Sequence, residues 1–168
     1  MSAARTIVLS PEQIEDRIER LAFQIYEDVV NDKKIVMAGV SKNGFVLAGK
    51  LRARFESISG LRPDLIEITL DKKNPAKDGA ALSETPAGIK DASIVVIDDV
   101  LDSGRTMIYA LRPFLEMGAR KIRTVVLADR SHKRFPVSAD FSGVSLSTTL
   151  QEHIRVVLDR GAEGVFLE

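Results

Sequence analysis

Apolar residues recur at helical spacing in the first part of the chain. Ser10-Pro11-Glu12-Gln13 combines a capping serine, a proline suited to the first helical position and a glutamine that can complete a capping box. The apolar residues that follow at this spacing are Ile14, Ile18, Leu21, Ile25 and Val29. The pattern predicts an amphipathic helix with one face on a core.

Four short segments predict β-strands. Lys34–Val40, Ser93–Ile97 and Lys121–Ala128 are apolar runs, and those at 93–97 and 121–128 have the character of strands buried on both faces in a parallel sheet. Asp64–Asp71 alternates apolar and polar residues, which predicts a strand with one wetter face. Short β-like runs also occur at 154–158 and 165–167.

Helical stretches follow two of these strands. Phe45–Phe55 carries leucines four residues apart, and a second stretch follows the strand at 93–97 and ends near Met117. Pro113 lies inside the second stretch and is expected to kink it, or to end its regular part near Arg112. The alternation of strand and helix predicts an α/β fold with a mainly parallel central sheet flanked by helices.

The loops after three predicted strands are expected to share one rim of the sheet. Ligands of open α/β sheets bind beyond the carboxyl ends of the strands. The loops at 41–44, 98–106 and 129–136 all leave such ends. Residues 72–91, rich in Lys, Gly, Ala, Pro and Asp, show no sustained period, so we expect a mobile loop over a site rather than an element of the fold.

Composition narrows the class of protein. The 168 residues include no cysteine and carry 24 Lys plus Arg against 24 Asp plus Glu. Disulfides and cysteine-based zinc sites are therefore excluded, and two histidines, His132 and His153, are too few for a histidine-rich metal site. Balanced charge argues against bulk capture of nucleic acid. Without a bilayer-length apolar run or a signal-peptide core, we expect one cytoplasmic domain.

The most informative segment is Ile94–Met107, IVVIDDVLDSGRTM. A buried strand leads into two carboxylates, and a Ser-Gly-Arg-Thr turn then opens a helix. Free amides at a helix amino terminus, a glycine and hydroxyl groups form a cradle for a phosphate. Asp98 and Asp99 would repel that phosphate unless they accept hydrogen bonds from hydroxyls of the same ligand. The segment therefore predicts a sugar phosphate site.

A purely structural alternative exists for this segment. Asp and Ser are common helix caps, so Asp102 or Ser103 would cap the helix and the aspartates would be an acidic strand end. Two adjacent aspartates after an apolar strand are costly if buried without partners, which weakens this alternative for the string as a whole.

The same segment resembles the phosphoribosyl-pyrophosphate signature of the type I phosphoribosyltransferases, and the resemblance extends over nearly the whole chain. Val40–Gly44 is similar to the family's pyrophosphate loop, with a cis peptide implied between Ser41 and Lys42. Leu127–His132 through Pro136, followed by Ala139–Gly143, looks most like the uracil phosphoribosyltransferase and pyrimidine-operon attenuation branch. The hypoxanthine-guanine salvage enzymes share a weaker version of it.

The resemblance implies a set of roles. It implies one phosphoribosyltransferase domain over 1–168, with a flexible catalytic loop at 72–91 and a base-binding hood of short strands at 129–168. The implied catalytic residues are Asp98, Asp99 and Asp102; those binding the 5′-phosphate are Asp102, Ser103, Gly104, Arg105 and Thr106; those binding pyrophosphate are Ser41, Lys42, Asn43, Gly44 and Lys72; those binding the base are Arg130, Phe141 and Ser142. One Mg²⁺ would be held mostly by substrate and water, with no direct protein ligand.

The implied reaction transfers the phosphoribosyl group of phosphoribosyl pyrophosphate to a nucleobase and releases pyrophosphate. The base stays open: residues 129–143 point to uracil, whereas Asp102 and Ser41-Lys42 point to a 6-oxopurine. Asp102 would exchange a proton with a purine ring or cap a helix. Phe141 would stack on the base or pack in the core, and Arg130 with His132 would form a surface turn if they do not bind it.

Two other functions remain open. The first alternative is a nucleotide-sensing regulator of pyrimidine genes that binds RNA, although the neutral net charge disfavours RNA binding. The chain would otherwise be a sugar phosphate-binding member of the fold without catalysis, which the intact signature makes the weakest alternative. The resemblance also implies a homodimer or homotetramer, and no membrane partner is expected.

Overall fold

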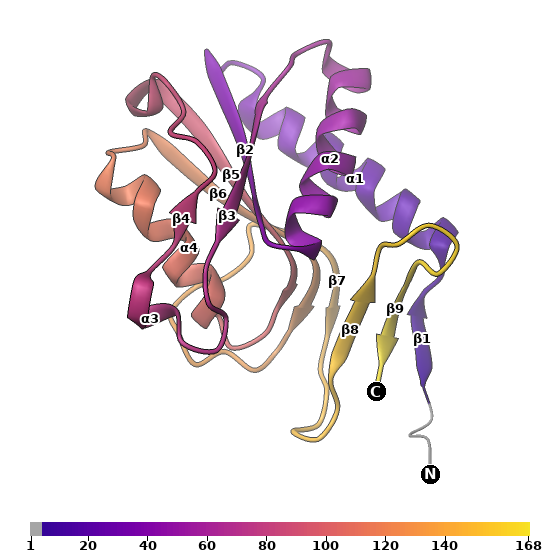
Figure 1. The fold of residues 1–168 in the computed structure, drawn as a ribbon. Coiled ribbons are helices and arrows are strands. Elements are labelled where there is room, and N and C mark those ends of the chain that lie inside the picture. The colour runs from indigo at the N-terminus through magenta and orange to yellow at the C-terminus, as the bar shows by residue number, and fades with distance from the viewer. Residues whose placement is uncertain (1–4) are drawn as a thin grey trace.

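A six-stranded sheet forms the centre of the protein, in a computed structural model that describes residues 5–168 (Figure 1). Its strand order is β4-β3-β2-β5-β6-β7. The bounds are β2 Lys34–Val40, β3 Asp64–Thr69, β4 Ala81–Leu82, β5 Ala92–Leu101, β6 Lys121–Arg130 and β7 Phe141–Leu146. Neighbouring strands are parallel except β3 and β4. The predicted α/β class with a mainly parallel sheet is confirmed.

Helices cover both faces of this sheet. α1 (Pro11–Val29) and α2 (Asn43–Ser59) pack on one face, where Leu21 and Leu51 share a buried cluster with Val95. α4 (Arg105–Glu116) packs on the other face, where Phe114 shares a cluster with Val96. β5 lies in the middle of the sheet and contributes to both cores, which explains why it is apolar on both faces.

The start of α1 agrees with the sequence prediction. The Gln13 amide donates to Ser10 Oγ at 3.3 Å, and the Ser10 amide donates to Gln13 Oε1 at 2.9 Å. The predicted apolar residues of this helix are buried. α2 begins at Asn43, two residues before the predicted start, so part of the predicted 41–44 loop is helical.

The expectation that the helix ends near Arg112, before Pro113, is wrong. α4 continues as helix through Pro113 to Glu116. Phe114, which follows the proline, is fully buried in the core under this helix. Burial of an aromatic side chain contributes more than the backbone hydrogen bond that the proline removes, so packing keeps the last turn helical.

Residues 72–91 contain elements that the sequence did not predict. They include α3 (Pro75–Asp78), β4 and a 3₁₀ turn η1 (Ile89–Asp91). β4 pairs with β3 through Ile68 and Leu82, and Pro75 is buried. The expectation that this segment forms no element of the fold is therefore wrong, because it completes the edge of the sheet; its role as a catalytic loop stays a prediction.

A second sheet of three antiparallel strands lies beside the first (Figure 1). Its order is β1-β9-β8, with β1 Thr6–Leu9, β8 Ile154–Val157 and β9 Gly164–Leu167. The predicted runs near 154 and 165 are confirmed, whereas β1 and β7 were not predicted. The segment 129–168, predicted as one hood, is therefore divided between the two sheets. Its strand β7 belongs to the central sheet, whereas β8 and β9 pair with β1, from the start of the chain, in the small sheet. Residues 1–4 of the predicted domain lie outside the described residues.

No helix within residues 5–168 combines the length and the apolar character that crossing a membrane requires.

Candidate functional site

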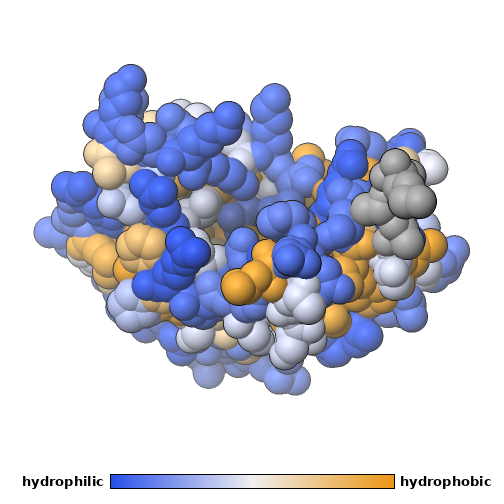
Figure 2. All heavy atoms as spheres, turned by 90° about the horizontal axis from the view of Figure 1, so that it is seen from below, coloured by the Kyte–Doolittle hydropathy of each residue, from blue (hydrophilic) through white to orange (hydrophobic). Residues whose placement is uncertain are grey.

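The carboxyl ends of the central strands meet at the lower end of the molecule in Figure 1, and Figure 2 shows this face from below. Hydrophilic residues dominate it, with apolar residues confined to small patches. The three loops expected to share this rim do come together. The Arg134 amide donates to the Ser103 carbonyl at 2.8 Å, and Gly44 lies against Asp98.

Asp98, which is buried, and Asp99, which is partly exposed, form an acidic pair within β5. The strand extends beyond its predicted end because it pairs with β6 as far as Leu101. Asp98 is 2% exposed, and its Oδ1 accepts a hydrogen bond from the Asp99 amide at 2.9 Å. The pKa of Asp98 is raised well above its usual range. Burial is the largest cause and the negative charge of Asp99 the second, whereas the positive charge of Lys72 opposes the rise.

The start of α2 approaches this acidic pair closely. A Cβ on Gly44 would lie 2.9 Å from Asp98 Oδ1 and 2.8 Å from the Ile97 carbonyl oxygen, so only glycine permits the approach. Asn43 Nδ2 donates to Asp99 Oδ2 at 3.1 Å and to the Val156 carbonyl at 3.0 Å. The side-chain amide of Asn43 therefore links Asp99 to β8 of the small sheet through two hydrogen bonds.

Lys72 contacts the pair, and Lys42 lies in the turn between β2 and α2. Lys72 Nζ lies 3.6 Å from Asp98 Oδ1, which places the start of the 72–91 segment over the carboxylates. The peptide bond between Ser41 and Lys42 is cis. The Ser41 amide donates to the Ile68 carbonyl at 2.8 Å, whereas Lys42 is exposed and has no ion-pair partner among residues 5–168. Lys42 is thus available to an anionic ligand.

The turn from Asp102 to Thr106 has the form of an anion cradle. Gly104 occupies the N-cap position of α4 at φ +86°, and no side chain caps the helix. A Cβ at Gly104 would lie 2.5 Å from Val137 Cγ1. The Arg105 backbone amide donates a hydrogen bond to Ser103 Oγ at 3.3 Å. Because no side chain of the N-cap residue caps the helix, the first-turn amides after Arg105 are available to bind a phosphate.

Asp102 does not cap the helix, which removes the structural alternative for this residue. Its Oδ1 instead accepts a hydrogen bond from Arg130 Nη1 at 3.2 Å, and its side chain is 52% exposed. Arg130 also donates from Nε to Thr148 Oγ1 at 2.6 Å and from Nη2 to the Thr149 carbonyl at 2.8 Å. The predicted base-binding arginine is therefore engaged by three protein groups.

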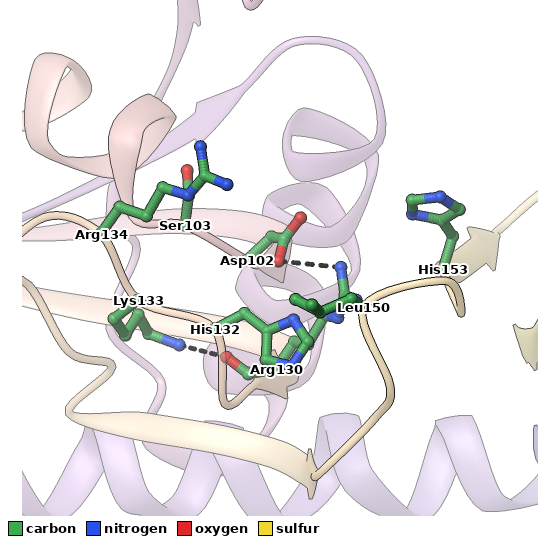
Figure 3. A pocket seen from close by; sticks show the side chains of 8 residues that line it. All are labelled: Asp102, Ser103, Arg130, His132, Lys133, Arg134, Leu150 and His153. Atoms are coloured by element: carbon green, nitrogen blue, oxygen red, sulfur yellow. Dashed lines mark hydrogen bonds and ion pairs between the residues drawn. The ribbon is translucent and has the colours of Figure 1, made fainter.

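A pocket of about 520 Å³ adjoins this turn (Figure 3). The residues that line it are Asp102, Ser103, Arg130, His132, Lys133, Arg134, Leu150 and His153. The site prediction missed the last three and did not place Lys133 or His132 in a pocket. Leu150 is 84% exposed, and one leucine in an otherwise polar run was the sequence signal that could have found it.

Two predicted base-binding residues, Phe141 and Ser142, lie on β7. Phe141 begins β7 and packs against the core under α1 and α2, as the packing alternative expected. Ser142 follows it, and its carbonyl accepts a hydrogen bond from Arg20 Nη2 at 3.1 Å. Neither residue is among those that line the pocket beside Asp102. The sequence could not reveal this, because the position of β7 depends on its pairing with β6.

The acidic side chains of the site suit a Mg²⁺ ion that binds together with the substrate rather than to the protein alone. Within residues 5–168 no cluster of three acidic, histidine or cysteine side chains would hold a metal ion by itself. Mg²⁺ commonly binds through one or two carboxylates together with substrate oxygens and water. The partly exposed Asp99 can supply one such carboxylate, so the residues present are compatible with such an ion.

Comparison with known proteins agrees with this geometry. The chain matches the phosphoribosyl transferase domain family over residues 5–162 and belongs to it. It is a type I member, and the relatives it resembles include the bifunctional protein PyrR of Microcystis aeruginosa, with 31% identity over 95% of both chains. The PyrR of Corynebacterium efficiens is 34% identical over 94% of this chain and 90% of its own.

Solved structures show the same fold. The hypoxanthine phosphoribosyltransferase of Trypanosoma cruzi superimposes with a TM-score of 0.78 at 19% identity, covering 96% of this chain and 95% of that chain. A hypoxanthine-guanine phosphoribosyltransferase of Bacillus anthracis gives 0.67 at 22% identity, covering 83% and 81%.

Proposed function

We propose that this protein transfers the phosphoribosyl group of phosphoribosyl pyrophosphate to a nucleobase, uracil or a 6-oxopurine, and releases pyrophosphate. The observation that carries the proposal is the turn after β5, where the acidic pair Asp98 and Asp99 precedes an uncapped helix start with Gly104 at positive φ. This arrangement offers carboxylates to a ribose and amides to a phosphate on one ligand.

The β5–α4 turn would hold the sugar phosphate. Asp98 and Asp99 would accept hydrogen bonds from the ribose hydroxyls, and residues 102–106 would bind the 5′-phosphate through backbone amides and hydroxyl groups. The hydrogen bonds that the backbone and Asn43 donate to Asp99 fix the orientation of its carboxylate before the ligand arrives. A preorganised acceptor costs less to align when the ligand binds.

The pyrophosphate would lie toward α2. Residues 41–44 would bind it through backbone groups and through Lys42, which has no competing carboxylate among the described residues. Lys72 would move from Asp98 to the pyrophosphate when the donor binds. A Mg²⁺ ion, which substrate and water would mostly hold, would neutralise charge on the leaving oxygens.

The base would occupy the pocket beside Asp102 (Figure 3). Leu150 offers an apolar surface for a planar ring, and Asp102 presents a carboxylate at the same edge. A ring nitrogen then forms the bond to the anomeric carbon as the bond to pyrophosphate breaks. Asp102 would take a proton from a purine ring, and its partial exposure and the absence of a capping role at α4 support this assignment.

A substrate panel tests the proposal. The protein would be incubated with phosphoribosyl pyrophosphate, Mg²⁺ and each of uracil, hypoxanthine, guanine, xanthine and adenine, and pyrophosphate release would be measured. We expect release with uracil or with one of the 6-oxopurines and none without a base. A protein that binds the donor but turns over no base would overturn the proposal.

RNA-dependent regulation is a second candidate function, which the similarity to proteins named bifunctional favours. A gel-shift titration at several salt concentrations would test it. Sequence-specific binding whose affinity falls steeply with salt would support an RNA site, because released counterions set that slope. Binding that does not distinguish RNA sequences would argue against this candidate.

A further inference from the structure

Arg130 lies at the end of β6 with a side chain that is only 6% exposed. A buried arginine is costly unless its charge and its donors are satisfied. Each of its three guanidinium nitrogens has a protein acceptor: Thr148 for Nε, Asp102 for Nη1 and Thr149 for Nη2. Two of these acceptors belong to the segment at 147–153 that joins β7 to β8, here named the hood loop.

We propose that Arg130 is a positioning residue that fixes Asp102 and the hood loop to each other, so that the two sides of the base pocket form one unit. This inference rests on the proposed function for its meaning in the reaction. It replaces the expectation that Arg130 itself reads an exocyclic oxygen of the base.

The geometry favours positioning over direct contact with the base. Three acceptors in different directions fix the plane of the guanidinium group, and no further rotation is open to it without breaking one of them. The Asp102 oxygen that faces Arg130 is Oδ1, whereas its other oxygen points away from the arginine in Figure 3. Arg130 therefore orients the carboxylate and leaves one oxygen for the ligand.

The hood loop carries the exposed side of the pocket. Leu150 and His153 line the pocket from this loop, and the Thr149 carbonyl that binds Arg130 immediately precedes Leu150. The Thr149 amide donates to Glu152 Oε2 at 2.7 Å, which closes the loop on itself. This hydrogen bond and, to a smaller extent, the charge of Arg130 lower the pKa of Glu152. Fixing Thr149 thus fixes the position of Leu150.

Hydrogen exchange of the ligand-free protein provides the first test. In Arg130→Lys the positive charge remains but one ammonium group cannot reach all three acceptors. We expect the amides of 147–153 to exchange about tenfold faster or more, because hydrogen bonds to a charged group contribute at least that factor to local opening. Thr148→Val, which removes one acceptor, should give a smaller increase. Arg112→Lys, at an exposed arginine of α4 paired with Glu116, is the matched control and should leave this loop unchanged.

Steady-state kinetics on the same variants provide the second test. We expect Arg130→Lys to raise the KM for the base and lower kcat, while the KM for phosphoribosyl pyrophosphate stays within about twofold of the wild type. Thr148→Val should shift the same parameters less, although it leaves the arginine in place. A direct contact between Arg130 and the base would leave the Thr148→Val kinetics unchanged.

The outcomes are distinct. Unchanged exchange at 147–153 in both Arg130→Lys and Thr148→Val would overturn the proposal whatever the kinetics. Faster exchange with unchanged base kinetics would also overturn it, because the loop would then be held without effect on the site. Should Arg130→Lys fail to fold, Thr148→Val decides both readouts. A wild type that turns over no base refutes the proposed function, and the exchange result still reports whether Arg130 holds the loop.

Discussion

Single residues at the end of β5 shape the candidate site. Asp98 is nearly inaccessible, Asp99 accepts hydrogen bonds from the backbone and Asn43, and Gly104 turns the chain into α4. The sequence predicted the importance of these residues because they are consecutive or nearly so. It could not predict the hydrogen bond from Arg130 to Asp102, since α4 and the rest of β6 separate the two residues along the chain.

Replacing Gly104 by alanine should destabilise the fold and weaken binding of phosphoribosyl pyrophosphate. The left-handed backbone costs an L-residue about 1–2 kcal/mol, and the added Cβ would overlap Val137, which costs about as much again. Urea unfolding and the KM for the donor would measure both effects. Gly118→Ala is the control, because Gly118 has a similar φ of +72° but no neighbour within 4 Å. An equal loss of unfolding free energy in Gly104→Ala and Gly118→Ala would contradict the steric argument.

Asp102→Asn should reduce turnover of a 6-oxopurine by about 10²–10⁴-fold, because an amide cannot take the ring proton. Asparagine retains an oxygen that accepts from Arg130, so the hood loop should keep its position. The KM for phosphoribosyl pyrophosphate is expected to change less than twofold, since the phosphate contacts come mainly from backbone amides. Undiminished purine turnover in this variant would remove Asp102 from proton transfer.

Helices and strands were predictable where their signal is local. α1 has its capping box and its apolar stripe within one stretch of sequence, and both are present. β1 and β7 carry weak patterns of their own, and their strand form depends on partners distant in sequence, β9 and β6. Pro113 is the reverse case, because a strong local signal against helix was overcome by burial of Phe114.

Ser10→Ala should lower the free energy of unfolding by about 1 kcal/mol without altering catalysis, because it removes the side-chain half of the α1 capping box. Thermal unfolding should then occur roughly 2–4 °C lower. Ser57→Ala, at an exposed position within α2, makes a suitable comparison and should leave stability unchanged or slightly higher. An identical response of the two variants would show that the cap contributes nothing.

At the scale of the whole molecule, a charged network ties the elements together at the amino end of the sheet, opposite the candidate site. Asp32 follows α1 and accepts hydrogen bonds from Ser93 on β5, from Arg120 and, at 2.8 Å, from Lys121 on β6. Desolvation of Asp32 acts to raise its pKa, but hydrogen bonds from Lys121, Ser93 and Arg120 outweigh it and lower the pKa to about 2. The network stabilises the charged carboxylate.

This shift predicts a pH dependence of stability. Because the pKa of Asp32 falls from 3.8 when unfolded to about 2 when folded, its contribution is fully present above that unfolded value and is lost as the pH falls toward 2. Asp32→Asn should therefore lower the unfolding free energy by about 1–2 kcal/mol at pH 7, and the gap from the wild type should shrink under acid. Urea titrations across pH 2–7 would measure it. Asp64→Asn, at a half-exposed pair with Lys34, should show little of this effect. A gap that stays constant with pH would contradict the prediction.

The sequence alone determined the α/β class, the order of the main helices and strands, and the acidic pair followed by the turn that opens a helix. Hydrophobic period, caps and this motif are local signals, and each is readable within a few neighbouring residues. Only the tertiary structure decided that Phe141 packs into the core, that β1 completes the small sheet, and that Arg130 joins Asp102 to the hood loop. Those features depend on contacts between residues far apart in the chain, which no local pattern encodes.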